Sequence, residues 1–321
     1  MKGTFLMAML VVFCMLVIPL SALKNPTSDV IPTTNTQSNI PYENSVNTNF
    51  EKIKVLKDGE ILEYNIKEYL FGVLAAEMPA LYEEEALKAQ AVAAYTFALY
   101  KKTTGATQDY DISSEPETAQ CFITRTEACA RWGTKAQEYT SKLDRCIASV
   151  LGQTITYDNQ PIFAAYHAMS AGITNSCKDV WGKDLPYLKS VNSNSDTLAD
   201  NFLTEVAFSP EDLSEKLKDF HLAENLSQDC FSEVNRNSSG YVTSLKYCGK
   251  EILGSDIRKA LNLRSCNFEI SFTDNLFKFT VKGYGHGVGM SQTGANAMAK
   301  QGKTYEEILL HYYPDTALQK N

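Results

Sequence analysis

The stretch GVLAAEMPA at residues 72–80 fixes the end of a helix and the place of one acidic side chain. Four side chains recur at the spacing i, i+3, i+4 and i+7, which is one face of a helix: Leu70, Val73, Leu74 and Glu77. Three of the four are apolar, so this face packs inward and takes Glu77 with it. Pro79 restricts the backbone of the residue before it, and the helix therefore ends near Met78.

A carboxylate at this position is partly withdrawn from water. Loss of hydration disfavours the charged form, and the negative end of the helix dipole acts in the same direction, so we expect a raised pKa for Glu77. A carboxylic acid that keeps its proton near neutral pH can donate that proton to a leaving oxygen. The alternative is that Glu77 turns to solvent past the last helical turn or pairs with a nearby lysine.

A second stretch, YGHGVGMSQ at residues 284–292, follows a predicted strand and opens a predicted helix. Its three glycines permit close backbone approach, and the start of the helix offers free N–H donors. The spacing fits neither the dinucleotide fingerprint nor a P-loop. The stretch is either a ligand-facing turn that carries His286 and Gln292 or a tight structural turn. His167, which ends a strand shortly before Ser170, is either a site residue or a core-edge histidine bonded to the backbone.

The chain as a whole predicts an α+β fold of mixed helices and antiparallel strands, with two subdomains and a cleft between them. Helices are expected near 67–78, 83–101, 136–151, 256–263 (capped by Ser255) and 291–300, with two more after the caps Ser209 and Thr304. Strands are expected at 62–66, 153–157, 162–167, 241–247, 267–272 and 276–281, with a hairpin turn at 158–161. Residues 109–131 lack a clean period and are expected to form a long ordered loop.

The composition is that of a globular protein. The chain is 44% hydrophobic and 21% charged, with 17 Gly and 10 Pro among 321 residues, which excludes collagen-like and mainly disordered classes. The formal net charge of −8 argues against a nucleic-acid partner, because duplexes require a basic surface.

The N-terminus carries an uncharged apolar run at residues 5–23, long enough to cross a bilayer as a helix. We expect an uncleaved transmembrane anchor over 1–24. A cleaved signal peptide is the alternative, although Leu20 disfavours cleavage after Ala22. Residues 25–50 are rich in Asn, Thr, Ser and Pro and are expected to form a flexible linker. The folded part, residues 51–321, is then expected outside the cytoplasmic membrane.

Cysteine and histidine patterns give no metal signature. Seven of the eight cysteines lie beyond the apolar run, so at least one has no intramolecular partner. One or two disulfides are expected in an oxidising compartment, with Cys230, Cys248 and Cys266 as contributors, whereas a reducing setting leaves them as thiols. The four histidines show neither HExxH nor paired Cys/His spacing, and we expect no metal and no cofactor.

Three motifs in fixed order carry a family resemblance. They are AAEMPA at 75–80 with EALKAQAVAA at 85–94; YH at 166–167 with VWG at 180–182 and PYL at 186–188; and GHGVGMSQ at 285–292 continuing to YYP at 312–314. Over roughly residues 51–321 the chain resembles the stage II sporulation protein D family of membrane-anchored peptidoglycan lytic transglycosylases, which is related to amidase enhancer proteins.

The resemblance implies an enzyme whose catalytic acid is Glu77. Such an enzyme cleaves the bond between N-acetylmuramic acid and N-acetylglucosamine and leaves a 1,6-anhydro end, so one carboxylate suffices where ordinary glycosidases use two. By motif position, His167, Ser170, His286 and Gln292 would line the glycan cleft. The alternative is a non-catalytic glycan-binding module that activates a separate cell-wall amidase.

The resemblance also implies a setting. The family degrades septal peptidoglycan during engulfment of the forespore, from the mother-cell membrane, on glycan strands already stripped of stem peptides. Its partners are a sporulation amidase/endopeptidase, stage II sporulation protein P, and stage II sporulation protein M.

Two departures from the family pattern stand out. Tyr95 occupies the position where the family usually has Arg, so any role of that Arg must be filled differently here. Some relatives carry a His/Cys zinc cluster in the loop after the second helix, but residues 109–131 contain no His, only Cys121 and Cys129.

Overall fold

The computed structural model describes residues 51–105, 109–114, 120–220 and 226–320. The anchor and linker expected over residues 1–50 lie outside this part of the chain. Among the described residues, no helix combines the length and apolar character needed to span a bilayer.

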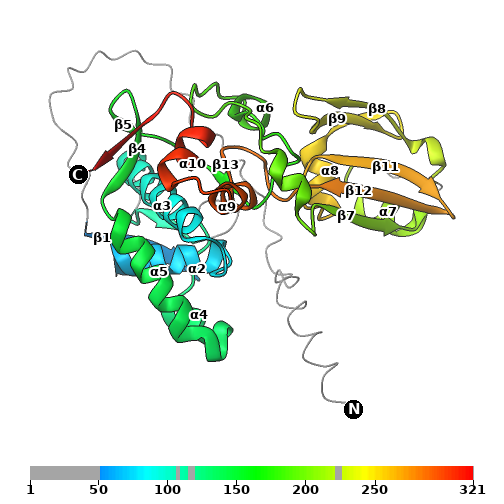
Figure 1. The fold of residues 1–321 in the computed structure, drawn as a ribbon. Helices are drawn as coiled ribbons and strands as arrows, with labels where there is room; N and C mark the ends of the chain where they lie inside the picture. Colours follow the sequence, from blue (N-terminus) through cyan, green and yellow to red (C-terminus); the bar gives the residue numbers. More distant parts are fainter. Residues whose placement is uncertain (1–50, 106–108, 115–119, 221–225, 321) are drawn as a thin grey trace. The chain divides into compact units, whose positions relative to one another are not determined.

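Helices and strands are mixed along the described chain (Figure 1). The helices are α2 (Ile66–Glu77), α3 (Glu84–Thr104), α4 (Arg125–Trp132), α5 (Ala136–Val150), α6 (Cys177–Trp181), α7 (Pro210–Lys216), α8 (Gly254–Ala260), α9 (Gln292–Lys300) and α10 (Tyr305–Tyr312). The strands are β1 (Lys52–Lys57), β2 (Glu60–Asn65), β3 (Ile112–Ser113), β4 (Gln153–Tyr157), β5 (Gln160–Pro161), β6 (Tyr166–His167), β7 (Leu203–Phe208), β8 (Phe231–Arg236), β9 (Val242–Tyr247), β10 (Lys250–Leu253), β11 (Phe268–Thr273), β12 (Leu276–Lys282), β13 (Met290–Ser291) and β14 (Ala317–Lys320). The class is α+β, as predicted.

The first hydrophobic core forms around α3, which contacts α2, α5, α9, α10 and β4 (Figure 1). The face of α3 formed by Leu87, Ala91, Ala94 and Ala98 is fully buried. Three of these four side chains are Ala, so neighbouring backbones can approach α3 closely, which suits a helix surrounded on most sides.

A second core is built entirely by residues between β7 and β12. Two three-stranded antiparallel sheets, ordered β10-β9-β8 and β11-β12-β7, pack with α7 and α8 around it. Its centre is aromatic, with Phe268, Phe277 and Phe279 completely buried. The alternating burial along β12 gives this strand one face toward the core, as period-2 patterning requires. Both cores belong to one compact unit, so the two subdomains and the cleft between them stay a prediction.

The chain passes from the first core to the second after β6 and returns at β13, and these two strands lie next to each other. β6 and β13 pair in parallel, with Tyr166 opposite Met290 and His167 opposite Ser291. Next to this pair, Met169 forms a bridge with Tyr284 and Asn175 with Val288. The segments that precede and follow the second core therefore lie side by side, although more than a hundred residues separate them.

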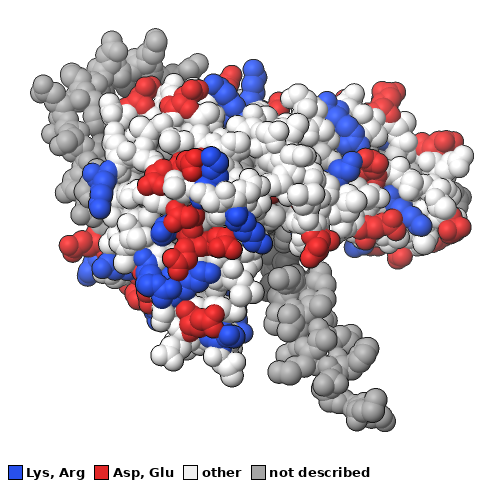
Figure 2. All heavy atoms as spheres, in the orientation of Figure 1, with Lys and Arg blue, Asp and Glu red and all other residues white. Residues whose placement is uncertain are grey.

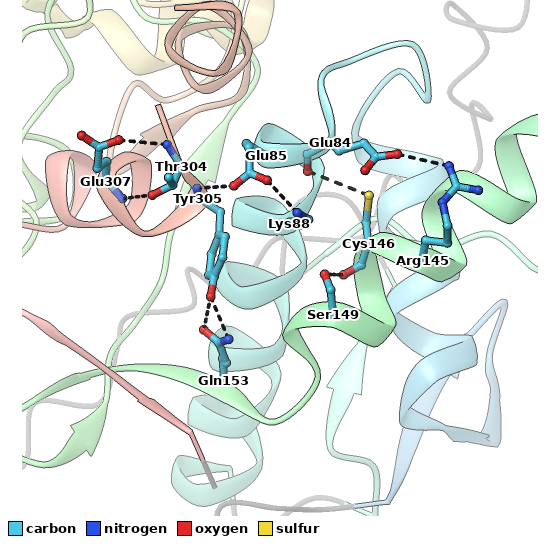
Figure 3. Close-up of polar contacts among 10 residues, drawn as sticks. All are labelled: Glu84, Glu85, Lys88, Arg145, Cys146, Ser149, Gln153, Thr304, Tyr305 and Glu307. Carbon is cyan, nitrogen blue, oxygen red and sulfur yellow. Dashed lines mark hydrogen bonds and ion pairs between the residues drawn. The ribbon is translucent and has the colours of Figure 1, made fainter. Parts of the chain in front are cut away.

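Ion pairs and caps fix the outer helices. Glu85 on α3 accepts hydrogen bonds from the Tyr305 backbone N–H at 2.8 Å and from Lys88 at 2.6 Å, which ties the start of α10 to α3 (Figure 3). Thr304 and Glu307 form the predicted capping box. Acidic and basic side chains are interspersed on the face shown in Figure 2. Ion pairs between exposed side chains contribute little to the stability of a fold.

Three local predictions are wrong in part. Residues 109–131, expected to be a loop, contain β3 and all but the last residue of α4, whose short length and polar face leave little periodicity. The predicted hairpin after β4 forms, but its second strand is β5 at 160–161 rather than 162–167, and β6 pairs with β13. The helix expected at 256–263 forms but begins two residues earlier, at Gly254, and its N-cap is Leu253 rather than Ser255.

Candidate active site

Glu77 is the last residue of α2. Leu70, Val73 and Leu74 on the same face are buried, as predicted from their spacing. Met78 adopts an extended backbone before Pro79, and its N–H closes the last turn by donating to the Leu74 carbonyl at 3.0 Å. Glu77 therefore stands at the helix terminus with its side chain directed by a packed face.

The carboxylate of Glu77 is crowded by polar groups from three other segments. The backbone N–H of Cys121 donates to Oε1 at 2.8 Å. The Cys121 thiol and the side chains of Gln292 and Tyr166 also interact with the carboxylate. Burial raises the pKa of Glu77, and these hydrogen bonds oppose that shift only in part. The groups that contact the carboxylate are a backbone N–H, a thiol, an amide and a phenol, and not the lysine of the alternative interpretation.

Gln292 reaches this site as the first residue of α9, which Ser291 caps. The Gln292 side chain is buried, and its Nε2 donates to Gln90 Oε1 on α3 at 3.4 Å. The structure thus brings Gln292 to Glu77 across more than two hundred residues, and its role in binding glycan stays a prediction.

Tyr166 and Cys121 were not among the predicted site residues. The Tyr166 hydroxyl lies close enough to lower the pKa of Glu77, yet no described residue holds it in a short hydrogen bond. The hydroxyl is buried and faces the Glu77 carboxylate. Strand alternation could have indicated Tyr166, because it and His167 must point to opposite faces of β6. Cys121 lies in an aperiodic segment and gave no signal.

His167 and His286 lie together on the other side of β6, with ring centroids 5.7 Å apart. His167 Nδ1 is 3.1 Å from the Val288 carbonyl, and His286 Nδ1 accepts from the Val288 N–H at 3.0 Å. Burial lowers the pKa of His167 to about 4 and, together with the neighbouring His167 and Arg258, that of His286 to about 3. Both rings are neutral near pH 7. His167 is buried and bonded to the backbone, as the core-edge alternative describes, and its place in the glycan cleft stays a prediction.

Because His167 is neutral when folded, unfolding should take up a proton on it. Its folded pKa of about 4 lies below the ordinary value of 6.5, so between these values the unfolded state binds more protons and stability rises with pH. We expect His167→Gln to reduce the slope of the unfolding free energy against pH in this window by up to about 1.4 kcal/mol per pH unit. Urea titrations across the window measure the slope; equal slopes in both proteins would contradict the assignment.

Ser170 is fully buried in a separate network centred on Asp196. The Ser170 backbone N–H donates to Asp196 Oδ2 at 2.8 Å, and its hydroxyl accepts from the Gly172 N–H at 3.1 Å. Ser193 links the same carboxylate to Tyr312. The structure does not bring Ser170 to the Glu77 carboxylate, and its predicted role in ligand binding stays a prediction that this burial disfavours.

Replacing Ser170 with alanine distinguishes a structural role in the Asp196 network from a role in glycan binding. Loss of the hydroxyl leaves the Gly172 N–H without its acceptor, so we expect Ser170→Ala to lower the unfolding free energy by about 1–2 kcal/mol. Glycan affinity of the folded protein should stay unchanged. Denaturant unfolding and glycan pull-down measure the two quantities, and weakened binding at unaltered stability would assign Ser170 to the ligand site.

Other groups bear on the site less directly. Tyr95, at the position of the family Arg, is 2% exposed and belongs to the first core.

In the described ranges, no three His, Cys, Asp or Glu side chains cluster as metal ligands, and the absence of a metal stays a prediction. Two surface cavities of about 320 and 410 Å³ are lined by second-core residues rather than by the groups around Glu77.

Comparison with known proteins adds a further finding. A family model described as "Stage II sporulation protein" matches residues 57–157. The chain is 34% identical over 252 residues to a stage II sporulation protein D of Bacillus amyloliquefaciens, covering 77% of this chain and 72% of the relative. It is 35% identical over 262 residues to that of Bacillus subtilis strain 168, covering 79% and 74%. It is also 26% identical over 303 residues to the amidase enhancer of Bacillus subtilis strain 168, covering 78% of this chain and 40% of the relative.

Proposed function

The chain belongs to the stage II sporulation protein D family, and from this we propose that it is a lytic transglycosylase that acts on peptidoglycan glycan strands during sporulation. The observation that carries the proposal is the raised pKa of the crowded Glu77 carboxylate, held at a helix end among Cys121, Tyr166 and Gln292. Among the described residues, the groups that act on the Glu77 carboxylate include no second carboxylate, which matches a reaction that needs none.

Glu77 acts twice in the proposed reaction. As the acid it protonates the oxygen that links N-acetylmuramic acid to N-acetylglucosamine, and the glycosidic bond breaks. As the carboxylate it then takes the proton of the muramic 6-hydroxyl, whose oxygen bonds to the anomeric carbon of the same sugar. The product is a 1,6-anhydro end, and the acid is regenerated. An internal hydroxyl competes well with water because it is already held next to the reacting carbon.

The surrounding groups favour this exchange of proton. The Cys121 N–H, at 2.8 Å, stabilises the carboxylate formed after proton donation, whereas burial disfavours that charge. The protonated and the charged form of Glu77 are therefore both accessible during the reaction. Neutral His167 and His286 suit an uncharged acetamido sugar. The proposal extends to glycan stripped of stem peptides, to the outer side of the mother-cell membrane, and to stage II sporulation proteins P and M as partners.

The reaction products test the proposal. Full-length protein is incubated with peptide-free glycan strands, and the ends are identified by mass spectrometry. Transglycosylation gives 1,6-anhydromuramic ends, whereas hydrolysis gives reducing ends heavier by one water. Reducing ends alone would overturn the proposed chemistry.

A second candidate function follows from the similarity to an amidase enhancer. In this case the chain binds glycan and stimulates a separate amidase without cleaving any sugar bond. Stimulation and binding would then survive Glu77→Gln, and no anhydro product would form at any pH.

The alkaline limb of the activity profile should depend on Tyr166. A general acid must be protonated, so activity falls as pH rises through the pKa of Glu77. Tyr166 lowers that pKa, and Tyr166→Phe should raise it and move the alkaline limb to higher pH. Initial rates of glycan cleavage across pH measure the limb. A matched Tyr82→Phe variant, whose hydroxyl contacts Thr293 instead, should leave it in place; a shift to lower pH in Tyr166→Phe would be the contrary result.

A further inference from the structure

The seven described cysteines have distinct environments, and none forms a disulfide in the structure. The Cys121 thiol meets Glu77, Cys129 lies 3.7 Å from the Thr140 hydroxyl, Cys146 lies 3.9 Å from the Glu84 carbonyl, and Cys266 meets Arg258. Cys230 and Cys248 differ from these, because each has the other's thiol as its neighbour.

Strand register brings Cys230 and Cys248 together. β8 and β9 pair antiparallel with Phe231 opposite Tyr247, so one step outward Cys230 lies opposite Cys248. The Cys248 N–H donates to the Cys230 carbonyl at 2.6 Å, which confirms this pairing beyond the ends of the strands. Directly opposed residues of antiparallel strands have Cα atoms about 4.5–5.5 Å apart, within the range that a disulfide spans.

A tight turn holds Cys248 in this position. Cys248 and Gly249 have φ angles of 49° and 82° and connect β9 to β10 as a two-residue hairpin turn. Cys230 is buried at 5% exposure under the second core, whereas Cys248 is partly exposed at the turn. One thiol of the pair is thus accessible to an oxidant, and the other is held behind it.

We propose that Cys230 and Cys248 form an intramolecular disulfide that links the start of β8 to the end of β9 when the protein meets a disulfide-bearing oxidant. The Cys248 thiolate attacks one sulfur of the oxidant and releases the first thiol. Cys230 then loses its proton, attacks the Cys248 sulfur and releases the second thiol. The protein loses two protons and two electrons, and the oxidant disulfide becomes two thiols.

The environment of the pair orders these steps. Burial raises the pKa of Cys248, and the hydrogen bond from the Cys230 thiol opposes part of that shift, whereas burial and the charge of Cys248 raise the pKa of Cys230 to about 12. Cys248 is also the more exposed of the two thiols. Cys248 is therefore the attacking thiol. The bond would close the β8–β9 hairpin and stabilise the second core without touching any group of the Glu77 site.

Mass spectrometry tests the pairing directly. Full-length protein is incubated with oxidised glutathione, free thiols are blocked, and the digest is analysed without reduction. We expect one cross-linked peptide joining Cys230 to Cys248, and a midpoint of thermal unfolding that falls by about 5 °C when the oxidised protein is reduced. Cys248→Ser should lose both the cross-link and the shift, whereas the matched Cys266→Ser should retain both.

Two results would overturn the proposal: glutathione adducts without a cross-link, or a cross-link of either cysteine to Cys266. The wild-type digest alone decides the pairing, so the test holds even if Cys248→Ser folds poorly. Because no step measures glycan cleavage, the outcome is independent of the proposed function.

Discussion

Replacing Glu77 with glutamine is expected to reduce glycan cleavage at least about a thousandfold, because the amide can neither donate nor recover the proton that the reaction transfers. The substitution keeps the size of the side chain and its place at the end of α2. Burial raises the pKa of Glu77, which means that the charged form is disfavoured in the folded state. A neutral amide escapes this cost near neutral pH, so the stability of Glu77→Gln should equal or exceed that of the wild type.

The measurement combines release of 1,6-anhydro ends with denaturant unfolding. Glu68→Gln is the matched control, since Glu68 lies on the same helix and pairs with Arg125 at 2.8 Å on the exposed side. The control should keep full activity and lose at most a fraction of a kcal/mol, about 0–1. Undiminished cleavage by Glu77→Gln would remove Glu77 from the mechanism; lost activity together with lost stability would indicate a structural role.

Replacing Gly289 with alanine is expected to lower the unfolding free energy by at least about 3 kcal/mol. Gly289 has a φ of 72°, which alanine adopts only with strain. In addition, an alanine Cβ would overlap the Ala165 carbonyl oxygen, which already accepts from Met290 N–H at 3.1 Å and from the Tyr313 hydroxyl at 2.8 Å. Backbone must therefore move where β13 joins β6.

Gly302→Ala provides the matched control for this prediction. Gly302 has a similar φ of 85°, but no heavy atom lies within 4 Å of the position an added Cβ would take. The control should cost only the strain of the backbone, about 1 kcal/mol. Urea unfolding of both variants measures the difference, and equal losses would show that close packing at Gly289 is unimportant.

The sequence predicted those helices and strands whose ends and buried faces are determined by residues close to them in the chain. The ends of α2 follow from an apolar face and Pro79, α7 from Ser209 and Pro210, and α10 from its capping box. In each case the stabilising contacts lie within one or two turns. The α+β class followed from the same elements.

Contacts between distant segments escaped prediction. Nothing near Tyr166 indicates that its strand pairs with Met290 rather than returning to β4. Likewise, the hydrogen bond from Cys121 to Glu77 arises from a segment without periodicity. The acid itself was predictable because its helix carries the signal, whereas the groups that tune its pKa depend on tertiary packing.

The parallel pairing of β6 and β13 has a consequence for biosynthesis. β13 and Gln292, the first residue of α9, emerge from the ribosome only after the whole second core has been translated. Until then Glu77 lacks the contact with Gln292, so a nascent or truncated chain has an incomplete candidate active site. The proposed glycan cleavage can therefore begin only after Gln292 has been translated, so the order of residues along the chain delays the first cut.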